Sequence, residues 1–170
     1  LLLQRYTGQR SVVFGATVAG RPAALADAER MLGLFINTLP VIQAPGPQRL
    51  LGEWLRELQS LNLTLREHEH TPLFDIQRWA GQGGQALFDS VLVFENYPVD
   101  SALRSGSGVR FGQVISRETT HYPLTVVIHA GDTLNVQLSY LLSAFAADSV
   151  VRIGEHLRNL LLAMAAPALD

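Results

Sequence analysis

The chain has 170 residues, no cysteine and a formal net charge of −2. That length suits one compact domain with a sizeable core, and the missing cysteines exclude disulfides, thiolate zinc sites and thiol nucleophiles. No run of Lys or Arg is present, so nothing favours binding to nucleic acid or to a membrane surface. Charged residues make up 16% of the chain, against about a quarter in typical domains. With so few charges, either a partner normally covers part of the surface, or the chain is an ordinary apolar-rich domain.

The first part of the chain predicts two strands between helical segments. Its opening residues, "LLLQRYTGQR", are typical of the last turn of a helix that begins upstream and closes at Gly8. β-Branched and apolar residues predict strands over 11–18 and 34–42. The Gly- and Pro-containing segment between them, 19–31, predicts a short Ala-rich helix or an ordered loop.

Two helices are predicted next. The first runs from about Gln48 to Glu67, and its apolar residues recur at steps of three and four, which places them on one face: Leu51, Trp54, Leu55, Leu58 and Leu65. The second is short and covers 70–81. We expect Thr71 to cap it, Pro72 to occupy its first position and Gly81 to end it.

Another strand is predicted within 86–98. Val91 to Phe94 contains no polar break, and a strand that is apolar on both faces is usually covered on both. The segment 101–108, "SALRSGSG", has the composition of a loop. A further strand is predicted over 109–116.

The last part predicts a β-hairpin and a helix. Residues 123–141 form the hairpin, and its second arm alternates apolar and polar residues from Leu134 to Tyr140. Asp148 is expected to cap the final helix, whose apolar stripe is Ile153, Leu157, Leu160, Leu161 and Met164. Strands that interleave with helices predict an α/β or α+β domain with a mixed sheet and helices packed on it.

Local motifs reveal no catalytic centre. His68 and His70 bracket Glu69, but two residues apart on a helix they point away from each other. In an extended segment they could share a metal, yet no third ligand is evident, so we predict no metal site. We expect the other histidines to be structural or solvated: His121, His129 and His156. No phosphate loop, nucleophile elbow or dinucleotide fingerprint occurs.

Four ordered blocks carry a more specific signal. "VVFGATVAGRP", "ERMLGLFINTLPV", "HEHTPLFDIQR" and "LFDSVLVFENYP" follow one another in this order, and "YPLTVVIH", "LNVQLSY" and "HLRNLLLAM" come later. Together they closely resemble the C-terminal half of a nonribosomal peptide synthetase condensation domain. The resemblance covers essentially the whole chain, so residues 1–170 are expected to form a single domain.

The resemblance implies a chloramphenicol-acetyltransferase-like lobe. In the family, two such lobes enclose a tunnel in which an acceptor amine attacks a donor thioester, both substrates being carried on the phosphopantetheine of carrier proteins. The family's HHxxxDG motif lies in the N-terminal lobe and does not occur here. The resemblance therefore implies the C-terminal lobe, with no catalytic residue and no directly bound cofactor. Its expected partners are the N-terminal lobe, both carrier proteins and an adenylation domain, in the cytoplasm.

The resemblance also implies where the tunnel lies. The family's "FxNT" strand runs by the lobe junction, and Asn37 and Thr38 point to opposite faces of it, so only one can face the tunnel. We favour Asn37, whose amide can both donate and accept. Alternatively, Asn37 satisfies a bend before Pro40. Asn96 is a further tunnel candidate, or equally a turn residue.

A second group implied by the resemblance lies in "AGRP". Arg21 is a candidate partner for the aspartate of HHxxxDG across the lobes, where it would hold the active-site loop in shape. An ordinary surface arginine is the alternative. Gly20 and Pro22 would shape the segment that crosses beneath the tunnel.

Two other functions stay open. One is a lobe of an epimerisation or other condensation-like domain, although "FINTLPV" and "GRP" favour a condensation domain. The other is a non-catalytic scaffolding module. A lobe without its neighbour would expose an apolar face and tend to self-associate.

Overall fold

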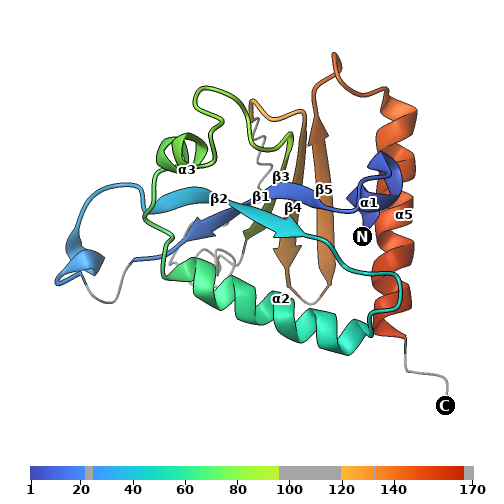
Figure 1. The fold of residues 1–170 in the computed structure, drawn as a ribbon, viewed down its shortest axis with the longest axis horizontal. Coiled ribbons are helices and arrows are strands. Elements are labelled where there is room, and N and C mark those ends of the chain that lie inside the picture. Colours follow the sequence, from blue (N-terminus) through green and yellow to red (C-terminus); the bar gives the residue numbers. More distant parts are fainter. Residues whose placement is uncertain (22–24, 96–119, 132, 167–170) are drawn as a thin grey trace, which may run out of the picture.

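The computed structural model describes residues 1–21, 25–95, 120–131 and 133–166 (Figure 1). Its elements in chain order are α1 (Leu2–Thr7), β1 (Val12–Ala19), the 3-10 turn η1 (Ala28–Arg30), β2 (Ile36–Gln43), α2 (Leu51–Arg66), α3 (Leu73–Trp79), β3 (Ser90–Glu95), β4 (Leu124–Ala130), β5 (Leu134–Tyr140) and α5 (Ala147–Ala165). The predicted segments 101–108 and 109–116 lie outside the described residues.

The strands form one five-stranded mixed sheet. Their order is β2-β1-β3-β4-β5, with β3 parallel to both of its neighbours. β2 and β5 are the edges, and each runs antiparallel to the strand beside it. The predicted mixed sheet is therefore confirmed. The predicted hairpin is confirmed as well, because β4 and β5 pair from Leu124–Tyr140 to Ala130–Leu134.

Helices α2 and α5 cover one face of this sheet. Leu39 belongs to that face and is only 2% exposed. Gln43 lies on the same face of β2, four residues after Leu39. Its Oε1 accepts a hydrogen bond of 2.9 Å from Nε1 of Trp54 on α2. Leu138 of β5 reaches α5 so closely that a Cβ at Gly154 would lie 3.0 Å from its Cδ1. Burial of these apolar side chains is the main source of the fold's stability.

The opposite face is covered by a small aromatic cluster. Phe88 is buried and its ring lies 5.5 Å, centroid to centroid, from that of Tyr122. Partial burial of the phenol raises the pKa of Tyr122. On the same side, Thr125 is 2% exposed and shares a hydrogen bond of 2.6 Å with the hydroxyl of Thr120. The buried hydroxyl of Thr125 is therefore hydrogen-bonded, which offsets the cost of removing it from water.

The buried stripes of the helices follow the 3.6-residue period. On α2 they are Trp54, Leu58, Leu61 and Leu65, each half-buried, so the prediction was wrong at Leu51 and Leu55, which are 36% and 43% exposed. Leu61, which the prediction left out, belongs to the stripe, at the spacing of the helical repeat. On α5 the five predicted stripe residues are all half-buried, which confirms the stripe. No helix of the described segments is long and apolar enough to cross a bilayer.

Four local predictions were wrong. Thr71 does not cap α3 and Pro72 is not its first residue, because the carbonyl of Pro72 accepts the first bonds from the N–H groups of Asp75 and Ile76, which makes Pro72 the N-cap. Asp148 lies inside the first turn of α5 and Ala146 is the N-cap. Phe94 is 55% exposed, so β3 is not covered on both faces at its end.

Candidate functional site: a pocket between β1, β2 and the α2–α3 turn

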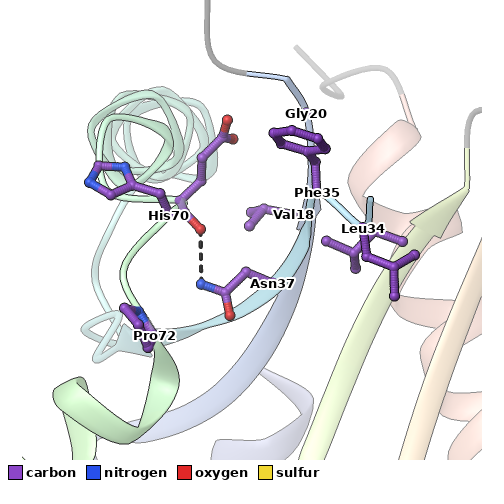
Figure 2. A pocket seen from close by; sticks show the side chains of 9 residues that line it. Val18, Gly20, Leu34, Phe35, Asn37, His70 and Pro72 are labelled. Atoms are coloured by element: carbon purple, nitrogen blue, oxygen red, sulfur yellow. Dashed lines mark hydrogen bonds between the residues drawn. The ribbon is translucent and has the colours of Figure 1, made fainter. Parts of the chain in front are cut away.

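A pocket of about 320 Å³ lies where the end of β1 and the start of β2 meet the turn between α2 and α3 (Figure 2). Gly20 and Phe35 connect there through a hydrogen bond of 3.2 Å from the Gly20 N–H to the Phe35 carbonyl. The pocket is lined by Val18, Gly20, Leu34, Phe35, Ile36, Asn37, Glu69, His70 and Pro72. Its walls are mostly apolar, with the carboxylate, the imidazole and the amide as the polar side chains.

Asn37 ties β2 to the α2–α3 turn. Its Nδ2 donates to the carbonyls of Glu69 and Thr71, at 2.9 and 2.7 Å, and its Oδ1 accepts the N–H of Thr38 at 2.9 Å. Figure 2 shows the amide pointing towards the turn that carries His70. Both N–H groups of the amide are thereby used, while Oδ1 keeps a second lone pair. Asn37 is therefore a pocket wall and an anchor at once.

Pro40 is compatible with β2 because β2 is an edge strand. It pairs with Gly15 of β1 on one side, and no strand of the described residues pairs with the other side. A proline cannot donate to a ladder, so an edge position is where a strand tolerates it. The same property discourages another strand from pairing with this edge.

Thr38 faces away from the pocket. It lies on the side of β2 covered by Phe88, where its Cγ2 would stand 2.8 Å from a Cβ at Gly15. The structure therefore brings Asn37 to the pocket and places Thr38 in packing contact with the aromatic cluster. Asn96 lies outside the described residues, as does Pro22.

Gly20 and Arg21 lie at the end of β1. A Cβ at Gly20 would stand 3.3 Å from Oε1 of Glu69, so the glycine lets this carboxylate approach the backbone closely. Arg21 turns towards η1 instead: its Nη1 donates to the carbonyls of Ala28 and Met31, the latter at 2.9 Å. Its Cζ lies 4.3 Å from the centroid of the Phe35 ring, a cation–π geometry.

Replacing Arg21 by Met should detach the η1 turn. The thioether side chain keeps much of the apolar stem over Phe35 but loses both hydrogen bonds to carbonyls, so we expect a loss of about 1–2 kcal/mol in the free energy of unfolding. Hydrogen exchange at residues 28–31 should rise by a larger factor than elsewhere. Arg10→Met, at an exposed position, is the control. Equal melting temperatures for the two variants would contradict this assignment.

The histidines form no common centre. His129 and Glu95 pair across β4 and β3, with Nδ1 of the imidazole 2.9 Å from Oε2 of the carboxylate. His156 of α5 shares a 2.8 Å hydrogen bond with the hydroxyl of Tyr6, which joins α1 to α5. His121 packs on Tyr122. In the part of the chain that the structure describes, no three histidine or carboxylate side chains gather to hold a metal ion.

Solved structures from nonribosomal peptide synthetases share this fold. The chain superposes on the first condensation domain of the calcium-dependent antibiotic synthetase with a TM-score of 0.72 and 24% identity, over 99% of this chain and 37% of that one. A four-domain nonribosomal peptide synthetase gives a TM-score of 0.79 at 16% identity, over 96% of this chain and 14% of that one. The predicted acetyltransferase-like lobe is thereby confirmed as the fold class.

The family model described as Condensation domain matches residues 1–169. The chain belongs to the condensation domain family.

Curated relatives are long synthases. A linear gramicidin synthase of Brevibacillus parabrevis is 43% identical over 166 residues, which cover 97% of this chain and 3% of that protein. Chondramide synthase cmdD of Chondromyces crocatus is also 43% identical over 166 residues, 97% of this chain and 4% of that protein. The chain thus spans only a few per cent of the length of these relatives.

The sequence did not single out Glu69 or His70 as pocket residues. Their segment lies 32 to 34 residues beyond Asn37, and it reaches β2 only because α2 folds back along the sheet. The one available signal was the pair of histidines around Glu69, a pattern that points to metal binding rather than to a pocket wall.

Proposed function

We propose that the chain is the C-terminal lobe of a condensation domain that joins an acceptor amine to a donor thioester, both tethered to carrier proteins. The observation that supports this proposal most is the coverage: the family model spans nearly the whole chain, yet the chain matches only 37% of a solved condensation domain. The absence of HHxxxDG from the sequence agrees with a missing catalytic lobe.

In this proposal the pocket forms part of the tunnel wall. Asn37 presents the remaining lone pair of Oδ1, which can accept an N–H from a bound substrate. Thr38 acts on the far side of the strand by holding β2 against Phe88, and Asn96 is a further tunnel position. The pocket itself binds no cofactor, because phosphopantetheine arrives with the carrier proteins.

Arg21 and its neighbours would face the other lobe. Among the described residues, the hydrogen bonds to η1 use only Nη1 of the guanidinium, and in this proposal Nε and Nη2 pair with the aspartate of HHxxxDG. Gly20 and Pro22 shape the same segment. Large apolar side chains around it are exposed, which supports a partner that covers them: Leu25, Met31, Leu32, Leu34 and Ile36.

The test is complementation. The purified chain alone should form no peptide bond between loaded carrier proteins, since it lacks the motif histidines. Co-expression with the N-terminal lobe of a close relative should restore product, detected by mass spectrometry of the carrier-bound peptide. The control is the same N-terminal lobe with its second motif histidine replaced by Ala.

Turnover by the chain alone would refute the proposal. So would restored turnover that survives loss of the motif histidine. Tight association of the two lobes without any product would support a scaffolding role instead.

A further inference from the structure

The carboxylate of Glu69 is the one acidic side chain among the described residues that line the pocket. It lies over Gly20, with Oε1 and Oε2 at 3.3 and 3.5 Å from where a Cβ would stand. The surrounding wall is apolar, formed by Val18, Leu34 and Pro72 among others. A carboxylate beside an apolar wall favours a ligand that carries a cation or a hydrogen-bond donor together with an apolar part.

The arginine beside Gly20 does not meet this carboxylate, and no ion pair of Glu69 occurs among the described residues. Arg21 follows Gly20 directly, yet its guanidinium is held over the Phe35 ring and on the carbonyls of Ala28 and Met31. The positive charge beside the pocket is therefore directed towards η1. Among the described residues the Glu69 carboxylate therefore remains available to a ligand that enters the pocket.

The backbone beneath Glu69 is held firmly. Asn37 binds the carbonyl of Glu69 itself and that of Thr71, two residues further on. A ligand that binds beside a main chain already held in place has less conformational freedom to remove there. The main chain of this part of the pocket is thus arranged before binding.

We propose that this pocket binds a primary ammonium group that carries a short apolar chain, with Glu69 as its counter-ion. The volume of about 320 Å³ lies at the lower end of small-molecule pockets. The apolar wall contacts the apolar chain of the ligand, and the carboxylate pairs with its ammonium group. Oδ1 of Asn37 is a second hydrogen-bond acceptor for that group. The inference rests on the proposed function, in which the amine-bearing acceptor is the source of this group.

The probe is 3-methylbutylammonium, with the neutral 3-methylbutan-1-ol as its isostere. Titrated into the intact 170-residue chain, the amine should shift the amide NMR signals of Val18, Gly20 and Glu69–Thr71. Glu69→Gln keeps the shape and removes the charge, so it should weaken amine binding about tenfold or more. The alcohol should bind weakly to both proteins. Glu67→Gln, exposed at the end of α2, is the matched control and should leave amine binding unchanged.

Gly20→Ala is a second variant that keeps the charge. Its Cβ would crowd the carboxylate by a few tenths of an ångström, so we expect a smaller loss of amine affinity, about twofold to fivefold. Amine binding that is equal in the wild-type chain and in Glu69→Gln would overturn the proposal. So would signal shifts confined to residues outside the pocket, or an alcohol that binds as tightly as the amine.

The titration needs no N-terminal lobe and no turnover. A failed titration with successful complementation would therefore reject only the ammonium site. Amine binding with failed complementation would reject only the proposed function.

Discussion

Replacing Asn37 by Ala should lower the free energy of unfolding by about 2–4 kcal/mol. The change removes three hydrogen bonds and leaves two carbonyls and the N–H of Thr38 to find other partners. A buried polar group left unsatisfied costs about 1–3 kcal/mol, and partial access of water at this site reduces the sum. Thermal and urea denaturation of the chain measure the effect. Asn62→Ala, at an exposed position on α2, is the control and should be neutral or slightly stabilising.

Asn37→Asp tests which half of the amide matters. It keeps an oxygen to accept the Thr38 N–H but sets a second oxygen against the carbonyls of Glu69 and Thr71. We therefore expect Asp to destabilise the chain at least as much as Ala, with raised hydrogen exchange at residues 68–72. An Asp variant as stable as the wild-type chain would show that the anchoring bonds contribute little.

The same variants separate anchoring from substrate contact in the assembled condensation domain. If Asn37 also accepts a bond from substrate, Asn37→Ala should reduce the rate of the folded enzyme by about ten- to a hundredfold. A large rate loss per folded enzyme molecule, in addition to the lower melting temperature, supports the contact with substrate. A lower melting temperature with normal turnover by the folded fraction would reject it and leave only the anchor.

Gly15→Ala should be as damaging as the loss of Asn37, for a steric reason. A Cβ at Gly15 would stand 2.4 Å from Cε2 of Phe88 and 2.8 Å from Cγ2 of Thr38. Phe88 is buried, so the ring must be displaced from its stack on Tyr122. Overpacking of this kind costs about 1–3 kcal/mol, and the loss of aromatic stacking adds to it. We expect a total of about 2–4 kcal/mol by the same denaturation measurements.

Gly52→Ala is the matched control for Gly15→Ala. Nothing lies within 4 Å of a Cβ at Gly52 on α2, so alanine should stabilise the chain there by up to about 1 kcal/mol. Phe88→Leu in the Gly15→Ala background should recover part of the lost stability, because the smaller leucine side chain leaves room for the new Cβ. Additive effects of the two changes would contradict the clash.

Local patterns were enough to determine most of the secondary structure. β-Branched runs placed β1 and β2, strict alternation placed the β4–β5 hairpin, and the apolar stripe placed α5. These features depend on neighbouring residues and on the period of the backbone. The helix ends were predicted less well, because Pro72 and Ala146 lie at the caps without a side-chain signal.

The ordered blocks also determined the family, since their residues are specific in combination. They directed attention to Asn37 and Arg21 but not to what these side chains contact. The partners of Asn37 lie 32 and 34 residues away, and those of Arg21 are backbone carbonyls. No pattern in the sequence marks a carbonyl as an acceptor, because every residue has one.

Only the tertiary structure decided the pocket. Glu69 meets Gly20, and Phe88 meets Gly15, because the sheet order places β1 between β2 and β3 while α2 returns the chain to the start of β2. Such close approaches depend on packing between segments that are distant in the chain, where shape rather than local propensity decides the outcome. The sequence alone therefore specified the elements and the family, and the packing of those elements produced the carboxylate-lined cavity.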